Sequence, residues 1–133
     1  MTDTNAVIFQ VLTGSTTTTL YGIVGTRVYF PQPPAGYKYN TASVVFHRSS
    51  ALRDYYVPDI DVDLVFHCYG GTGNLHSAVA VYNALHARLH GLCDTTVSAG
   101  TLVESYQTIG AQDLRDPETG IPFVLSGFRA IVQ

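Results

Sequence analysis

The residues of this sequence best suited to metal chemistry are two histidines four positions apart. His86 and His90 stand in the run His-Ala-Arg-Leu-His. On a helix both imidazoles would project from one face, where such a pair can bind zinc. The metalloprotease motif needs a glutamate directly after the first histidine, and Ala87 occupies that place. No third ligand stands nearby, so the simpler interpretation is a pair of polar histidines beside a buried stripe.

Three alternating aspartates form a second candidate site. Asp59, Asp61 and Asp63 resemble the first ligands of a calcium-binding loop. Leu64 stands where that loop requires glycine, and Gly70 replaces its bidentate glutamate. The pattern therefore favours an acidic strand face over a calcium site. Such a face could line a channel and repel a passing polyanion.

Other catalytic signatures are incomplete. The run Gly70-Gly71-Thr72-Gly73 precedes a predicted helix, but it lacks the P-loop lysine and does not fit the dinucleotide-binding glycine pattern. No serine stands in a Gly-x-Ser-x-Gly motif. The sequence therefore predicts no catalytic residue, no metal and no cofactor, which is typical of a protein that is not an enzyme.

Composition narrows the possible partners. The net charge is −3 and the seven basic residues do not cluster, so nucleic-acid binding is not expected as a primary function. Only 13% of residues are charged, about half the usual share. With nine tyrosines, this indicates either a surface that meets other protein or a Thr- and Tyr-rich β protein with a neutral surface.

The length predicts a single domain, residues 1–133, with a core of its own. Cys68 and Cys93 are too few for a disulfide framework, and we interpret both as structural thiols of a cytosolic protein. The first residues have no basic region typical of a signal peptide, and no apolar run approaches the roughly 18 residues needed to cross a membrane. No membrane partner is expected.

The elements that must position these residues are clearest in the second half. Residues 59–69 alternate as a strand with one buried face. Residues 74–90 form an amphipathic helix that begins at Asn74 or Thr72 and ends before Gly91, a left-handed cap. The buried strand face is predicted to comprise Ile60, Val62, Leu64, Phe66 and Cys68, and the buried helix face Leu75, Val79, Tyr82, Leu85 and Leu89.

The last third predicts a long hairpin. Strands over residues 101–112 and 121–132 flank the turn Asp116-Pro117-Glu118-Thr119-Gly120. Both strand faces carry apolar residues, so we expect the sheet to be covered on both sides over part of its length. The fold class is therefore α+β: an antiparallel sheet, one main amphipathic helix packed on it, and a long C-terminal hairpin.

The first half is less regular. Residues 6–12 are almost wholly apolar and could be a helix capped by Thr4 or Asn5, or a strand. The remaining expectations are a loop over 13–19, a helical turn ending near Gly25, a strand from Arg27, a proline loop over 31–36, a strand over 41–48 and a connection over 49–57.

The order of these pieces resembles the tail-completion or tail-terminator family of long-tailed bacteriophages. The matching pieces are Gly25-Thr26-Arg27-Val28-Tyr29 before the prolines, the central strand over 62–69, a helix closing in Leu89-His90-Gly91, and the final hairpin with its Asp-Pro-Glu-Thr-Gly tip. The resemblance covers most of the chain in order and spacing. It departs at Asn40-Thr41-Ala42-Ser43, where the family often has a Leu-Pro-aromatic run.

The resemblance implies a structural virion protein that closes the head-proximal end of a tail tube as a ring, usually of six subunits. Its partners would be its own copies, the tail tube protein and the head completion or connector protein, with DNA only passing through the lumen. It would be assembled in the host cytoplasm and lie at the head–tail junction of the virion.

The surfaces we expect to serve this role combine the acidic strand face with two loops, since binding residues concentrate on loops held by a rigid scaffold. The acidic face would meet the lumen or a neighbouring subunit. The residues are Asp59, Asp61 and Asp63 on that face, and Tyr37, Tyr39, Arg115, Asp116 and Glu118 on the partner-contact loops.

Three alternatives fit the same sequence. The first is another head–tail joining protein, such as a connector stopper. The second is a small metal-dependent enzyme that uses His86, His90 and one further ligand. The third is a β-rich binding module that stays monomeric.

Overall fold

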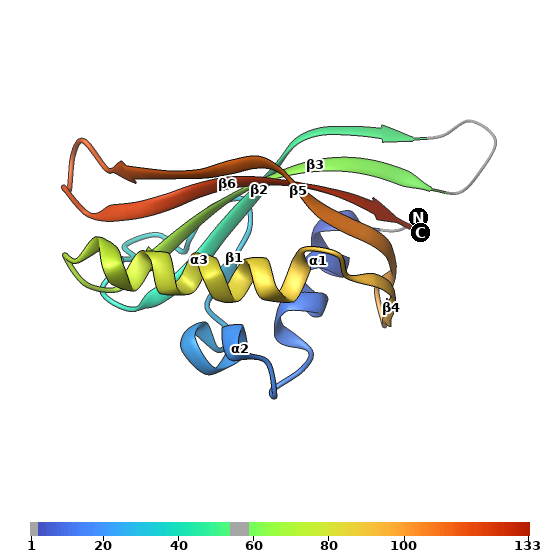
Figure 1. Ribbon diagram of the computed structural model, residues 1–133, viewed down its shortest axis with the longest axis horizontal. Helices are drawn as coiled ribbons and strands as arrows, with labels where there is room; N and C mark the ends of the chain where they lie inside the picture. Colours follow the sequence, from blue (N-terminus) through green and yellow to red (C-terminus); the bar gives the residue numbers. More distant parts are fainter. Residues whose placement is uncertain (1–2, 54–58) are drawn as a thin grey trace.

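A six-stranded sheet with helices on one face forms the body of the protein (Figure 1). The computed structural model describes residues 3–53 and 59–133. The sheet order is β1-β2-β3-β6-β5-β4; β1 and β2 are parallel, and every other neighbouring pair is antiparallel. The predicted α+β class is confirmed. The strands are β1 Val28–Tyr29, β2 Ala42–Arg53, β3 Ile60–Gly70, β4 Cys93–Val97, β5 Gly100–Arg115 and β6 Pro122–Val132.

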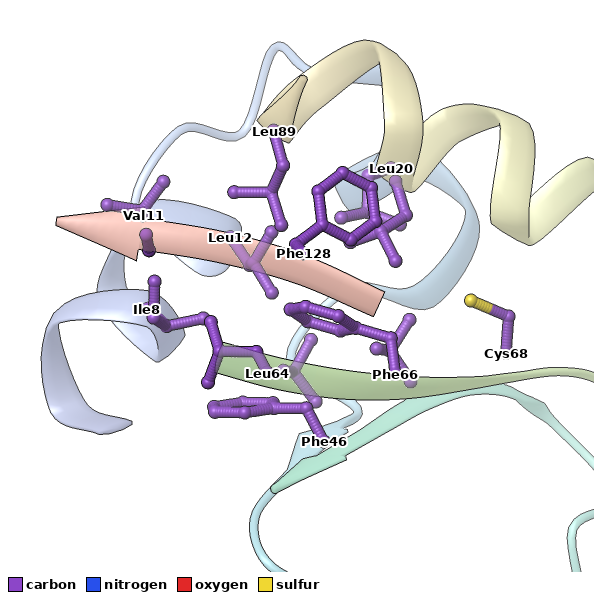
Figure 2. Close-up of a cluster of buried hydrophobic side chains, with 14 of the residues drawn as sticks. Ile8, Val11, Leu12, Leu20, Phe46, Leu64, Phe66, Cys68, Leu89 and Phe128 are labelled. Carbon is purple, nitrogen blue, oxygen red and sulfur yellow. The ribbon is translucent and has the colours of Figure 1, made fainter. Parts of the chain in front are cut away.

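The predicted alternation of β3 is confirmed. The five residues of its predicted buried face, which alternate from Ile60 to Cys68, are buried, while the residues between them are partly exposed. The buried face meets the helices, and three phenylalanines from neighbouring strands pack there (Figure 2). The Phe66 ring lies 5.5 Å from Phe46 and 5.4 Å from Phe128, centroid to centroid. This cluster joins β2, β3 and β6 in one core.

Strand β2 is longer than predicted. We expected a strand over 41–48 and a connection from Ser49, but β2 continues to Arg53 and pairs with β3 throughout. The pairing register shifts between Arg48 and Ser50, so Ser49 is a bulge. A bulge interrupts the alternation of side chains, which explains why the sequence pattern ends there. Residues 54–57 of the expected connection lie outside the described residues.

The N-terminal segment is a helix, α1, Thr4–Thr13. Asp3, rather than Thr4 or Asn5, caps it: its carboxylate accepts hydrogen bonds from the backbone N–H of Asn5 and Ala6. Its buried residues recur with helical spacing, which resolves the ambiguity between helix and strand. They are Thr4, Val7, Ile8, Val11 and Leu12.

The next elements agree with prediction. Helix α2, Thr19–Val24, ends at Gly25, and β1 follows at Val28. The Arg27 side chain holds this corner, because it donates from Nε to the Ala42 carbonyl at 2.8 Å and from a terminal nitrogen to the Ile23 carbonyl. No strand lies between residues 31 and 41, as expected of the proline loop.

Helix α3, Leu75–Leu89, confirms the main amphipathic helix. Asn74 caps it by accepting from the N–H of His76. Gly91 has the expected positive φ of 78° and donates to the Ser105 carbonyl at 2.8 Å. This bond ties the end of the helix to β5.

The buried face of α3 differs from the prediction. Leu85 and Leu89 are buried as expected, but Leu75, Val79 and Tyr82 only border the core. Small residues face inward instead, and they allow α3 to pack closely on α2 and β3. The additional buried positions are Ala78, Val81 and Ala84.

The C-terminal hairpin of β5 and β6 is confirmed, and β5 is longer than predicted. The sequence pattern missed β4, which pairs antiparallel with the start of β5. We interpreted both cysteines as structural thiols; Cys93 on β4 is exposed. Cys68 is buried, and burial raises the pKa of its thiol.

The two faces of the sheet are covered unequally. We expected cover on both sides over part of the length, yet α1, α2 and α3 all lie on one face (Figure 1). On the other face, which we call the open face, Tyr39 from the proline loop packs against Tyr69 of β3. The candidate surfaces must therefore be sought on the open face and at the ends of the long strands.

Candidate assembly surfaces

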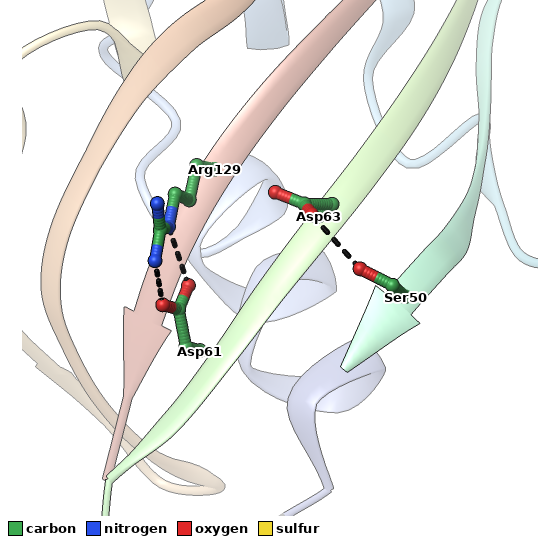
Figure 3. Close-up of polar contacts among 4 residues, drawn as sticks. All are labelled: Ser50, Asp61, Asp63 and Arg129. Carbon is green, nitrogen blue, oxygen red and sulfur yellow. Dashed lines mark hydrogen bonds and ion pairs between the residues drawn. The ribbon is translucent and has the colours of Figure 1, made fainter. Parts of the chain in front are cut away.

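The acidic strand face lies at the start of β3, on the open face of the sheet. Asp61 forms an ion pair with Arg129 of β6 (Figure 3). The Arg129 Nε donates to Asp61 Oδ1 at 2.7 Å, and a second bond joins Nη2 to Oδ2. The hydrogen bond from Arg129 holds the pKa of the Asp61 carboxyl below its usual range. Asp61 is therefore ionised and held in place.

The other two aspartates also have partners. Asp63 Oδ2 accepts a hydrogen bond from Ser50 Oγ at 2.8 Å, and Asp59 Oδ1 accepts one from the side-chain amide of Gln133 at 2.7 Å. The three carboxylates share one face, as the alternation predicted. Arg129 offsets part of their charge, so the surface is less acidic than the sequence of β3 indicates.

Arg129 is the residue of this surface that sequence reasoning missed. It stands opposite Asp63 in the β3–β6 register, although 66 positions separate the two in the printed numbering. The sequence predicted both strands but not their pairing. An isolated arginine between Phe128 and Ala130 gives no local signal of an ion pair.

The predicted contact residues Tyr37 and Tyr39 pack in a row of aromatic side chains. The Tyr39 ring lies 4.5 Å from that of Tyr69 and 5.0 Å from that of Tyr37. The Tyr37 hydroxyl is bonded to Thr41, 3.0 Å from its carbonyl oxygen. Tyr39 has a positive φ of 56°, uncommon for a residue other than glycine.

The aromatic row continues across the open face, which suggests a preformed surface instead of isolated contacts. Successive ring centroids lie between 4.5 and 5.9 Å apart. We call this row the aromatic band. Its members are Tyr29, Tyr37, Tyr39, Tyr69, Phe123, His67 and His47.

The second contact loop is the tip of the β5–β6 hairpin. The Asp116 carboxylate accepts hydrogen bonds from the N–H of Glu118 at 2.8 Å and of Thr119 at 3.2 Å. Arg115 donates to the Gly120 carbonyl at 2.8 Å. The tip is thus shaped by its own side chains, as a turn opened by aspartate requires, while the Glu118 side chain is exposed.

The structure brings the two contact loops together. Burial raises the pKa of Tyr39, and the negative charge of Asp116 raises it further. Burial first, then the neighbouring Tyr39 and the charge of Asp116, raise the pKa of Tyr69 to about 12. The strand register agrees: Leu114, two residues before Asp116, pairs with Phe123, whose ring lies 5.4 Å from that of Tyr69.

The acidic face lies away from this pair of loops. Asp61 and Tyr69 are eight residues apart on one strand, or roughly 26 Å at strand spacing. In Figure 1 the hairpin tip is at the left, and the C-terminus, beside Asp59, is at the right. The predicted site residues thus form two separate surfaces at opposite ends of the sheet.

The histidine pair has a geometry of its own. The rings of His86 and His90 stack with centroids 4.6 Å apart and planes 14° apart. The Nδ1 of His90 accepts a hydrogen bond from the backbone N–H of Gln107 at 3.1 Å. Residues 3–53 and 59–133 contain no group of three or more His, Cys, Asp or Glu side chains placed to hold a metal ion.

No helix among the described residues is long and apolar enough to cross a membrane.

The chain was also compared with known proteins. No protein-family model matches it, and no curated protein sequence does. It is similar in structure to a chain solved in the "Virion of native gene transfer agent (GTA) particle", with a TM-score of 0.74 and 24% sequence identity. The likeness covers 97% of this chain and 93% of that one. At this identity the match establishes the fold, which the two chains share over nearly their full length.

Proposed function

We propose that this protein is a structural component of a phage-like virion. In this role it closes the head-proximal end of a tail tube as a homo-oligomeric ring, six subunits in our proposal, and joins the tube to the head connector. Its partners are its own copies, the tail tube protein and the connector or head completion protein; DNA passes through the lumen. The protein performs no chemistry.

The observation that supports this most is the likeness to the gene transfer agent chain. It spans 97% of this chain and 93% of the other, so it extends well beyond a shared motif within larger proteins. A fold alone does not imply a function. Here the sequence resemblance to tail-completion proteins and the structural likeness to a virion chain point independently to the same class of particle.

The arrangement of the surfaces is compatible with a cap that has two partners. The hairpin tip and the aromatic band lie at one end of the sheet, and the acidic face lies at the other. A ring built from such subunits would present different residues on its two rims. In this proposal Tyr37, Tyr39, Arg115, Asp116 and Glu118 contact a partner protein, while Asp59, Asp61 and Asp63 face the lumen or a neighbour.

The experiment that tests this function is assembly with the tube protein. The purified chain is measured by light scattering, alone and mixed with the tail tube protein of the same particle, and the mixture is imaged by electron microscopy. We expect a discrete oligomer near six times 14.4 kDa and tubes closed at one end. Tubes that elongate unchanged, with the chain monomeric in both samples, would contradict the proposal.

The same images separate the closest alternative. A connector stopper would bind the connector and leave tube growth unaltered, whereas a tail terminator would stop it. The zinc alternative is tested by metal analysis of the purified protein. Stoichiometric zinc that is lost in His86→Ala would favour an enzyme or ligand-binding domain over a structural cap.

A further inference from the structure

The sheet has two edges that are each closed by a partner strand over only part of their length. At one edge β1 pairs with β2 at Val44 and Val45 alone. At the other edge β4 pairs with β5 only between Gly100 and Glu104. No other strand among residues 3–53 and 59–133 pairs with the outer side of β2 or β5. Exposed strand edges are templates for pairing with another chain.

The open stretches are placed at opposite ends of the sheet. The short strand β1 closes the beginning of β2 and leaves the end of β2 open. Strand β4 closes the beginning of β5 and leaves residues 108–115 open. Because β2, β3, β6 and β5 are successively antiparallel, β2 and β5 run in opposite directions. A second copy in the same orientation would therefore bring its β2 antiparallel to this β5.

The short strands β1 and β4 make each edge of the sheet protrude at one end, and the two protruding ends are opposite. When the copies are staggered along the strands, β1 of one copy lies beyond the tip of β5, and β4 of the other lies beyond the end of β2. The strands of a closed barrel are staggered in this manner. The bulge at Ser49 divides the open edge of β2 into residues 46–48 and residues 50–53.

The side chains of the open part of β5 suit a protein partner. All residues from 108 to 115 are exposed. Two of the three large hydrophobic residues exposed in the described part of the chain, Ile109 and Leu114, lie there, with 46% and 41% of their surface accessible. Apolar exposure of this kind on an unpaired edge favours association.

The segments beside the two open edges differ in charge. The end of β5 and the hairpin tip, residues 108–120, contain three carboxylates, Asp113, Asp116 and Glu118, and one basic residue, Arg115. Strand β2 contains Arg48, which donates to Thr4 Oγ1 at 3.4 Å, and has no carboxylate between Ala42 and Ala51. An acidic hairpin tip is better placed beside a strand without carboxylates than beside a second acidic tip, which disfavours contact between two identical β5 edges.

We propose that the open edge of β5 in one copy pairs antiparallel with the open edge of β2 in the next. The contact is head-to-tail, so it can repeat around a ring and continue one sheet through all subunits. This inference rests on the proposed ring function and names the surface that would form the ring.

The backbone indicates which groups would make the bonds. The N–H of Asp116 donates to the Ile121 carbonyl, so Asp116 bonds toward β6. Because bonding alternates along an antiparallel strand, Leu114 and Gln112 also bond toward β6, whereas Asp113 and Arg115 direct their backbone groups outward. Asp113 lies opposite Val124 and Ala51 opposite Val62, both core positions, so both side chains lie on the helix-bearing face.

The test is cross-linking between Asp113→Cys and Ala51→Cys, made in a Cys93→Ser background because Cys93 is exposed. A short bismaleimide should join the double variant into covalent multimers larger than a dimer. Each single-cysteine variant should stay monomeric on a denaturing gel. Covalent dimers of the Asp113→Cys single variant would show pairing of identical edges and would overturn the proposal.

A second variant tests the backbone bond itself. Asp113→Pro removes an outward N–H but leaves the bonds to β6, so the thermal unfolding midpoint should change little while oligomers are lost. The matched control, Asp113→Ala, keeps the N–H and should retain most of the oligomer. Equal oligomer in both variants would overturn the proposal.

These outcomes are separable from failure of the proposed function. Rings that form and cap tubes but show no β2–β5 cross-link would contradict the edge pairing alone. Cross-linked rings that leave tube growth unchanged would contradict the capping function alone. A chain that remains monomeric with tube protein present, and gives no multimers on cross-linking, would contradict both.

Discussion

The side chain of Ile109 on β5 lies directly over the backbone of Gly127 on β6. A Cβ atom placed on Gly127 would come within 2.7 Å of Ile109 Cδ1. The two residues are paired in the register, and Ile109 shields Gly127 from solvent while remaining half exposed itself. The absence of a side chain at Gly127 of β6 therefore leaves room for the apolar side chain of Ile109 on β5.

We predict that Gly127→Ala lowers the free energy of unfolding by about 1 kcal/mol, because Ile109 must move aside. The measurement is urea unfolding of the single variants and of Gly127→Ala with Ile109→Ala. The second substitution should relieve the first, giving a coupling of at least ~0.5 kcal/mol. Strict additivity of the two effects would show that the contact is unimportant.

Gly70 is predicted to be the least tolerant glycine of those described. A Cβ there would lie 2.4 Å from the backbone nitrogen of Ala78, and the backbone of α3 cannot give way as a side chain can. Gly70→Ala should cost about 3 kcal/mol. Gly73→Ala is the control, since nothing lies within 4 Å of its added Cβ, and its effect should stay within about 0.5 kcal/mol. Equal midpoints for the two variants would refute this packing.

The His67 imidazole should make stability depend on pH. Burial lowers its pKa, and the neighbouring His47 lowers it further. The unfolded chain, with a histidine pKa near ~6.5, then binds the proton more readily than the folded chain. Stability should be full above that pH and decline as the pH falls from it toward the folded-state pKa. Unfolding measured between pH 7 and 5 should show a weaker decline in His67→Phe than in the wild type.

Tyr69 should produce the opposite dependence in alkali. Its folded-state pKa is raised to about 12, mainly by burial, whereas the unfolded phenol ionises near ~10. The contribution to stability is therefore present below pH ~10 and is lost as the pH rises toward 12. Urea midpoints at pH 9 and 11 should fall less for Tyr69→Phe than for the wild type. An equal fall in both would assign the alkaline sensitivity elsewhere.

The acidic face gives a prediction about assembly. If Asp59, Asp61 and Asp63 contact a neighbouring subunit, the Asp61→Lys, Asp63→Lys variant should lose its oligomer, measured by light scattering. The neutral pair Asp61→Asn, Asp63→Asn controls for the loss of the bond to Arg129 and should lose less. Intact rings from the lysine variant would argue against a contact between subunits and favour a lumen-facing role.

Regular alternation let the sequence determine several elements by itself. In β3 every second residue from Ile60 to Cys68 is apolar, and α3 has a cap at Asn74 and a stop at Gly91. These signals are local, and the structure keeps them because tertiary packing uses the faces that they define. The two strands of the C-terminal hairpin and the α+β class followed from the same signals.

Sequence patterns that are short or continuously apolar did not determine the secondary structure. Residues 6–12 are so uniformly apolar that their period is concealed, and packing of Val7, Ile8 and Val11 against the sheet selects the helix. The exposed strand β4 has no apolar face to reveal it. The buried face of α3 differs from the predicted one because the space between the helix and the sheet favours small residues such as Ala78 and Ala84.

The candidate surfaces depended most on the tertiary structure. The sequence identified the aspartates, the tyrosine loop and the hairpin tip as separate features. Only the strand order β3-β6-β5 places Arg129 beside Asp61, brings Asp116 to Tyr39 and leaves opposite edges of the sheet open. Strand pairing joins residues far apart in the chain, so no local pattern encodes it, whereas the alternation of a strand and the period of a helix are written in neighbouring residues.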